Sequence, residues 1–170
     1  MVVRSINTDG GISGVHVVAM PYPGQGHINP MMNLCKRLAS FGDLLITFVV
    51  TEEWLSFILS SAGSATPPSN LRLRSLPNVI PSERARADDF PAFVEAVYTK
   101  MEEPFERLLD QLEPAVSAIV ADSYLPWAVA VGNRRDIPVA SLWPMAASVF
   151  SMLYHSDVVA EHHPFPIPIS

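Results

Sequence analysis

Five short apolar runs alternate with segments of helical periodicity along this chain. The run LLITFVVT at residues 44–51 is rich in β-branched residues, as strands buried on both faces are. Regular alternation of strand and helix predicts a parallel sheet with right-handed crossovers, because each helix carries the chain back to start the next strand. We therefore predict an α/β fold with a Rossmann-like, doubly wound parallel sheet. The expected strands are Val15–Met20, Leu44–Thr51, Leu71–Leu76, Val116–Ala121 and Pro138–Trp143.

Capping residues and prolines predict where the helices begin and bend. Asn29 is expected to cap a helix ending at Ser40, with Pro30 at the first helical position, where proline is tolerated. Asp89 is expected to cap a long helix that bends at Pro104, because proline removes a hydrogen-bond donor. The helices expected from these signals cover residues 30–40, 52–60, 90–112, 125–135 and 145–159.

Length and composition predict one domain with a sizeable core. The chain has 170 residues, of which 49% are hydrophobic and 16% are charged. We expect a flexible segment over residues 1–14, a Rossmann-like domain over 15–160 and an extended, proline-rich tail over 161–170 (EHHPFPIPIS). Doubly wound sheets usually have about six strands, so the sheet is expected to be incomplete and the chain to be a fragment or truncated product.

Charge and hydropathy exclude several classes of partner. The net charge is −6 and the basic residues are scattered, so no nucleic-acid partner is expected. No apolar run approaches the roughly 20 residues that a membrane span needs. The single cysteine, Cys35, excludes an internal disulfide and fits a reducing compartment, so we expect a cytoplasmic location.

A glycine-rich turn follows the first expected strand and is the strongest functional signal. Residues 20–30 read MPYPGQGHINP and lead from an apolar strand into an apolar-periodic helix. Open α/β proteins bind ligands at such turns, at the carboxyl end of the sheet. Glycine lets backbone approach a ligand closely, and histidine exchanges its proton near neutral pH. The presence of His27 in this turn therefore indicates chemistry on a small ligand.

The usual doubly wound strand order brings a carboxylate to the same place. In the order 3-2-1-4-5 the first and fourth strands are neighbours, so His27 and Asp122 are expected to open into one crevice. A carboxylate on one ring nitrogen orients the imidazole, and the other nitrogen can then take a proton from a substrate hydroxyl. Two structural alternatives stay open. Asp122 can cap the helix starting near Leu125, and His27 can stabilise its own turn.

Other functional classes fit the sequence less well. The dinucleotide fingerprint needs a third glycine where this chain has Asn29, although Gly24, Gly26 and Glu52 leave an NAD-binding remnant open. His155, His162 and His163 lie in or near the proline-rich tail, which is a poor metal cage, so no metal site is expected.

Several motifs in matching order resemble plant UDP-dependent glycosyltransferases of small molecules. The resemblance covers nearly the whole chain after residue 14, and the sequences of the motifs are most similar to the 87A subgroup of that family. The segments that carry it are residues 16–34, 49–54 (VVTEEW), 102–105 (EEPF), 122–127 (DSYLPW) and 137–143 (IPVASLW).

The resemblance implies the acceptor-binding, amino-terminal part of a two-domain GT-B enzyme. His27 then matches the general base for the acceptor hydroxyl and Asp122 the residue that orients it, while UDP-sugar is a co-substrate and no cofactor is required. The sugar is expected to be glucose, and the acceptor a small phenolic or hormone-like molecule. The expected acceptor-binding residues are Gln25, Gly26, Phe90, Trp143 and Met145, within a pocket that also includes the region 77–93.

Two departures from the family pattern concern the donor sugar. The carboxyl-terminal domain that holds the UDP-sugar is missing from this sequence, so the chain alone is expected to be inactive. Pro144 stands where many relatives have a threonine able to touch the donor. A non-catalytic product that binds small molecules or a partner protein is therefore the alternative function.

Overall fold

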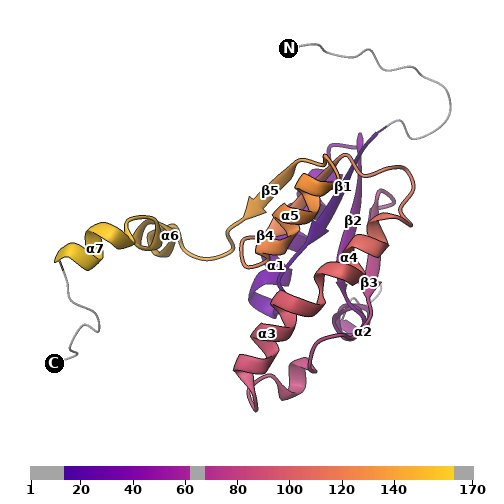
Figure 1. The fold of residues 1–170 in the computed structure, drawn as a ribbon. Coiled ribbons are helices and arrows are strands. Elements are labelled where there is room, and N and C mark those ends of the chain that lie inside the picture. Colours follow the sequence, from indigo (N-terminus) through magenta and orange to yellow (C-terminus); the bar gives the residue numbers. More distant parts are fainter. Residues whose placement is uncertain (1–13, 62–67, 163–170) are drawn as a thin grey trace, which may run out of the picture.

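The computed structural model describes residues 14–61 and 68–162, which form a five-stranded parallel sheet. The strand order is β3-β2-β1-β4-β5, so the predicted doubly wound order is confirmed (Figure 1). The expected flexible segment, apart from Gly14, lies outside the described residues. The strands are β1 Val15–Met20, β2 Leu44–Thr51, β3 Leu71–Leu76, β4 Ala118–Asp122 and β5 Val139–Leu142.

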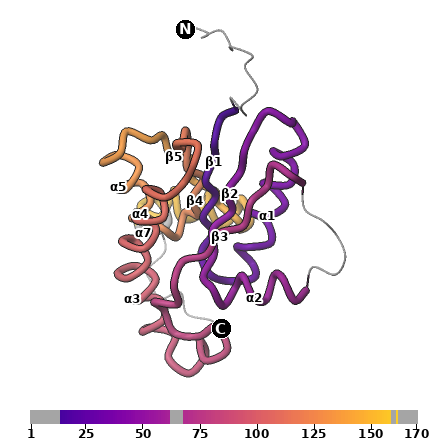
Figure 2. Tube along the Cα trace, turned by 90° about the vertical axis from the view of Figure 1, so that its right-hand side faces the viewer, coloured from indigo at the N-terminus to yellow at the C-terminus, as the bar shows by residue number. Residues whose placement is uncertain are grey.

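Helices cover both faces of this sheet and make a three-layer fold. Figure 2 shows α1 and α2 on one side of the strands and α3, α4 and α5 on the other. The helices are α1 Gln25–Ala39, α2 Glu52–Ser61, α3 Phe90–Lys100, α4 Glu102–Leu109, α5 Pro126–Arg134, α6 Ala147–Tyr154 and α7 Ser156–His162, with a short 3-10 turn, η1, at Glu83–Ala85.

The two faces of the sheet bury separate hydrophobic cores, because successive side chains of a strand point to opposite faces. On β1, Val18 and Met20 pack toward α3, α4 and α5, where Phe93 and Phe105 are fully buried. Ala19 points to the other face, toward α1 and α2. The alternation on a single strand therefore holds both helical layers on the sheet.

The helix α1 begins four residues earlier than the expected cap, so the prediction of Asn29 as its cap is wrong. Gly24 is the N-cap, with an extended backbone, and its carbonyl accepts hydrogen bonds from the N–H groups of His27 and Ile28. Pro30 lies inside the helix and removes only the bond that would reach Gly26. His27 therefore lies in the first turn of α1, and its backbone N–H is hydrogen-bonded to the carbonyl of Gly24.

The long helix expected over 90–112 is two helices that meet at Met101. A proline ring clashes with the carbonyl four residues before it, which for Pro104 is that of Lys100, the last residue of α3. Pro104 itself lies in the first turn of α4, where its missing N–H is not needed. The predicted bend is therefore a break three residues earlier, and α4 ends at Leu109.

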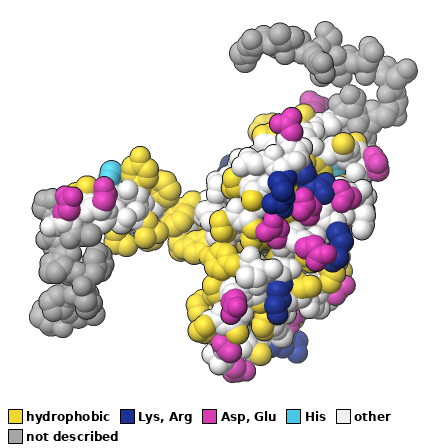
Figure 3. Space-filling view, viewed as in Figure 1, with side chains coloured by type: hydrophobic (Ala, Val, Ile, Leu, Met, Phe, Trp, Pro, Cys, Tyr) yellow, Lys and Arg dark blue, Asp and Glu magenta, His cyan; other side chains and the backbone are white. Residues whose placement is uncertain are grey.

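The single helix expected over 145–159 is also two helices, α6 and α7, separated at His155. Glu161 and His162 belong to α7, so the extended tail does not start at 161, and residues 163–170 lie outside the described part. Both helices lie away from the sheet (Figure 1). Apolar side chains gather over α6 and the segment leading to it (Figure 3), and Phe150 and Leu153 there are half exposed.

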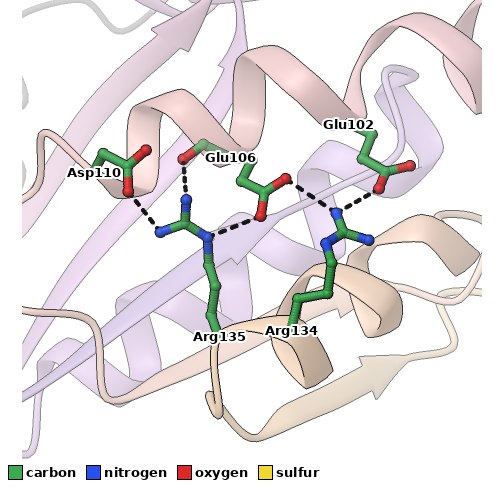
Figure 4. A network of polar contacts seen from close by, with 5 residues as sticks. All are labelled: Glu102, Glu106, Asp110, Arg134 and Arg135. Atoms are coloured by element: carbon green, nitrogen blue, oxygen red, sulfur yellow. Dashed lines mark hydrogen bonds and ion pairs between the residues drawn. The ribbon is translucent and has the colours of Figure 1, made fainter.

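A network of charges joins α4 to the end of α5 (Figure 4). Arg135 pairs with Glu106 at 3.1 Å and with Asp110 at 2.7 Å, and Arg134 reaches Glu102 and Glu106 at 2.6 and 3.0 Å. The hydrogen bonds from the two arginines lower the pKa of the Glu106 carboxyl, and the bond from Arg135 lowers that of Asp110. The network thus ties together two of the three helices that cover one face of the sheet.

Candidate active site

The carboxyl ends of β1 and β4 bring His27 and Asp122 into direct contact. Both strands are parallel neighbours, with Met20 opposite Ala121, so the chain leaves both at the same edge of the sheet. His27 follows through the turn into α1, and Asp122 is the last residue of β4. The Nδ1 atom of His27 lies 2.8 Å from Oδ2 of Asp122. The predicted convergence of these two side chains is confirmed.

The two carboxylate oxygens of Asp122 have different partners. Oδ2 faces His27, whereas Oδ1 accepts a hydrogen bond from the backbone N–H of Tyr124 at 3.0 Å. The cap of α5 is Leu125, without a side-chain hydrogen bond, so the alternative that Asp122 caps this helix is wrong. Its side chain is fully buried, while 22% of the His27 side chain stays exposed. The carboxylate is therefore buried with a partner on each oxygen, whereas the imidazole is partly exposed.

This arrangement determines which ring nitrogen is free for chemistry. An ionised carboxylate can only accept hydrogen bonds, so Nδ1 of His27 carries the hydrogen toward Asp122. The lone pair of a neutral ring then lies on Nε2, for which the described residues provide no hydrogen-bond partner. An imidazole held in this way can take a proton from a ligand hydroxyl placed beside Nε2.

Another histidine, His16, shows what a structural role looks like in the same fold. His16 on β1 is fully buried. Its Nε2 lies 2.8 Å from the Thr47 hydroxyl and its Nδ1 lies 2.6 Å from the carbonyl oxygen of Pro114. Both ring nitrogens are occupied, so His16 cross-links neighbouring segments and has no free nitrogen. The His27 side chain, by contrast, is partly exposed, and its Nε2 has no hydrogen-bond partner among the described residues.

Two tyrosines that the sequence analysis did not single out flank His27. The ring centroid of Tyr22 lies 5.0 Å from that of His27, and the centroid of Tyr124 lies 5.4 Å away in an edge-on contact. Tyr22 precedes the glycine turn and Tyr124 follows Asp122 by two residues. Their closeness in the sequence to His27 and Asp122 is the signal that could have identified them, because all four side chains lie at the same edge of the sheet.

The expected acceptor-binding residues divide into two groups. Trp143 stacks on Tyr124, with ring centroids 5.9 Å apart, and the sulfur of Met145 accepts a hydrogen bond from the Tyr124 hydroxyl at 3.7 Å. These two residues are therefore linked to His27 through a single tyrosine.

The remaining three expected residues are exposed. Gln25 and Gly26 open the first turn of α1, immediately before His27. Phe90 begins α3 with 54% of its surface exposed, and the ring contacts of the described residues do not include it. Their part in acceptor binding stays a prediction.

The loop between β3 and α3 reaches the turn that precedes His27 through Arg86. The guanidinium of Arg86 donates a hydrogen bond to the carbonyl of Pro23 at 3.4 Å, pairs with Glu83 at 3.0 Å and lies over the ring of Phe93. Burial raises the pKa of the Glu83 carboxyl, although the nearby Arg86 opposes that effect. The region 77–93, expected to line a pocket, is thus in contact with the turn that precedes His27.

A groove of about 410 Å³ lies at the carboxyl ends of β2 and β3. Its walls come from the start of α2, including Glu52 and Phe57, and from the loop after β3, including Asn78 and Arg84. Neither His27 nor Asp122 lines it. We place the candidate site at the His27–Asp122 contact, because no histidine lines the groove.

Two other kinds of site are absent from residues 14–61 and 68–162. No cluster of three or more histidine, cysteine, aspartate or glutamate side chains is arranged there to hold a metal ion. None of the helices in this part of the chain combines the length and apolar character needed to cross a bilayer.

Comparison with known proteins identifies the family. Residues 13–164 match the family model described as the amino-terminal domain of glycosyltransferases. UDP-glycosyltransferase 87A2 of Arabidopsis thaliana is 58% identical over 149 residues, which is 86% of this chain and 32% of that protein. The 7-deoxyloganetin glucosyltransferase of Catharanthus roseus is 32% identical over 155 residues, covering 85% and 32% of the two chains.

A solved structure agrees with the fold. Os79 of O. sativa, determined in complex with UDP, superposes with a TM-score of 0.67 at 25% identity, covering 88% of this chain and 33% of that one. The chain therefore spans about a third of the length of the relatives it matches. With both the domain model and the relatives in agreement, this chain belongs to the plant UDP-dependent glycosyltransferases and corresponds to their amino-terminal domain.

Proposed function

We propose that this chain binds the acceptor and removes its proton in a UDP-glycosyltransferase that moves glucose onto a small phenolic or hormone-like hydroxyl. The observation that carries the proposal is the 2.8 Å contact between His27 and the buried carboxylate of Asp122. Glucose is supported by the name of the Catharanthus relative, a glucosyltransferase. A cytoplasmic location is part of the proposal and is supported by Cys35, the one cysteine of the chain.

In the proposed reaction the acceptor hydroxyl lies beside Nε2 of His27. As its proton moves to Nε2, the oxygen forms a bond to the anomeric carbon of the sugar. The bond between that carbon and the UDP oxygen breaks, UDP leaves with the bonding electron pair, and the configuration is inverted. Asp122 stabilises the imidazolium that forms, because its carboxylate remains hydrogen-bonded to Nδ1.

The proposed acceptor-binding residues are Gln25, Gly26, Phe90, Trp143 and Met145. Aromatic side chains near His27 support an aromatic acceptor, since flat rings gain from stacked or edge-on contacts. We also propose that the chain alone has little activity, because it spans a third of its relatives' length and a donor-binding part has to come from elsewhere.

The test joins this chain to the carboxyl-terminal two thirds of the 58% identical Arabidopsis relative. The fusion and the chain alone are incubated with UDP-glucose and a panel of phenols, and glucosides are measured by mass spectrometry. We expect product from the fusion and none from the chain alone. Product at equal rates from a His27→Ala fusion would remove the proposed base, and vigorous turnover by the chain alone would refute its inactivity.

A further inference from the structure

The hydrogen bond to Asp122 holds only one atom of the His27 ring. The ring is also attached to the backbone through two rotatable bonds, and small correlated changes of χ1 and χ2 can redirect Nε2 while the hydrogen bond at Nδ1 is kept. Proton transfer needs Nε2 within hydrogen-bond distance of the hydroxyl in a defined direction. Contacts with the faces and edges of the ring therefore restrict the remaining motion of its plane.

The rings of Tyr22 and Tyr124 supply such contacts from two sides, and we call these two residues the tyrosine bracket. The plane of Tyr22 is tilted by 46° to that of His27, and the plane of Tyr124 stands at 82° to it. The two tyrosine rings also contact each other, with centroids 6.1 Å apart. These separations lie within the range of about 4.5–7 Å over which aromatic rings attract.

Each ring of the tyrosine bracket is itself held in place. Tyr22 is 8% exposed and contacts Phe93 of α3 at a centroid distance of 6.4 Å. Tyr124 stacks on Trp143 and its hydroxyl contacts the sulfur of Met145. The support therefore comes from one helix packed on the sheet and from the segment that follows β5.

Tyr124 contacts both members of the candidate pair. Its backbone N–H donates to Oδ1 of Asp122, and its ring lies edge-on to His27. The hydroxyl of Tyr22 is not a competing base, since burial raises its pKa and keeps it protonated near neutral pH. The bracket thus acts through packing.

We propose that Tyr124, assisted by Tyr22, is a positioning residue that holds the plane of the His27 imidazole so that Nε2 points at the acceptor hydroxyl. This inference rests on the proposed function of His27 for its purpose. The geometric part, a ring held in one orientation with its hydrogen on Nδ1, can be tested without any glycosyl transfer.

The test uses the 170-residue chain with ¹⁵N-labelled histidine, and the His27→Asn variant identifies the His27 signals in the NMR spectrum. In the wild type we expect one tautomer, with hydrogen on Nδ1, and slow exchange of that hydrogen with water. Tyr124→Phe keeps the ring and should behave like the wild type. Tyr124→Leu should show mixed tautomers and at least tenfold faster exchange.

A second pair of variants, Tyr22→Leu and Tyr22→Phe, keeps the test decisive if Tyr124→Leu does not fold. Backbone amide spectra and urea midpoints report folding for every variant. The wild-type tautomer and exchange rate in every leucine variant that folds would overturn the proposal, as would a Tyr124→Phe variant that behaves like Tyr124→Leu. These readouts do not depend on activity, so they stand if the glycosyl-transfer proposal itself fails.

Discussion

The imidazole of His27 and the carboxylate of Asp122 lie 2.8 Å apart, although 95 residues separate them in the sequence. They meet because β1 and β4 are parallel neighbours whose carboxyl ends coincide. No local motif contains both residues. The pair therefore depends on the sheet topology. His27 lies in α1, which follows β1, and Asp122 is the last residue of β4.

Asp122 and His27 should act as one unit in glycosyl transfer. In the fusion described above, we expect Asp122→Asn and His27→Ala each to lower kcat by about 10²–10⁴-fold, because the first removes the charge that supports the imidazolium and the second removes the base. The double variant should be no slower than the slower single variant. Initial rates of glucoside formation measure this. Losses that multiply in the double variant would show that the two residues act separately.

The charge network between α4 and α5 should make stability depend on pH. The pKa values of Glu106 and Asp110 are lowered in the folded chain, so the unfolded chain binds more protons than the folded chain as the pH falls. The contribution is fully present above the ordinary values of 4.5 and 3.8 and is lost as the pH drops through the lowered ones. The Arg134→Met, Arg135→Met double variant should therefore lose less stability than the wild type on acidification.

Urea unfolding from about pH 7 to about pH 3 measures this difference. Arg107→Met is the matched control, because its pair with Glu103 is exposed on both sides, at 59% and 77%. We expect its pH curve to follow the wild type. Parallel curves for the double variant and the wild type would contradict the prediction.

Gly132 on α5 should not tolerate a side chain. A Cβ there would clash with the side chain of Val139 and lie 2.7 Å from the carbonyl oxygen of Ile137. We expect Gly132→Ala to lower the free energy of unfolding by about 1–3 kcal/mol.

Gly26 provides the control for Gly132. It is helical and exposed, and a Cβ there meets no atom within 4 Å. Gly26→Ala should raise the free energy of unfolding by up to about 1 kcal/mol, because alanine loses less backbone entropy in a helix. Urea denaturation of both variants decides the matter, and equal effects at the two positions would show that the α5–β5 contact is not tight.

Cys35 should be chemically inert in the folded protein. It is buried on α1 between the helix and the sheet, and burial raises the pKa of its thiol to about 12. Only the thiolate attacks a disulfide, so we expect reaction with an aromatic disulfide reagent at neutral pH to be on the order of 10²–10³-fold slower than in urea. Absorbance of the released thiol follows the reaction, and Cys35→Ser is the blank. Equal rates in both conditions would contradict burial of the thiol.

The strand order and the pairing of His27 with Asp122 could be predicted because alternating strands and helices permit few topologies. The residues at which the helices begin and end were harder to predict from the sequence. The signal of Asn29 and Pro30 for a helix start was outweighed by Gly24, whose carbonyl already accepts two helical hydrogen bonds. The break at Met101 depends on the carbonyl of Lys100, four residues before the proline, and not on the proline's own position.

The surroundings of the pair could not be predicted from the sequence. The contact between Tyr22 and Tyr124 depends on rotamers that only the packed helices determine. The hydrogen bond from Arg86 to the carbonyl of Pro23 likewise spans 63 residues and arises from a loop without periodicity. Such contacts follow from tertiary packing, so patterns within one segment carry no signal for them.

The central place of β1 has a consequence for biosynthesis. Its two neighbours in the sheet are β2 and β4, and the second of these is made long after the first. While the ribosome adds the intervening residues, the flank of β1 that will receive β4 has no partner, and His27 has no carboxylate. The contact between His27 and Asp122 therefore forms only after β4 has been made, and a nascent chain stalled before Asp122 carries an open sheet edge that other chains can join.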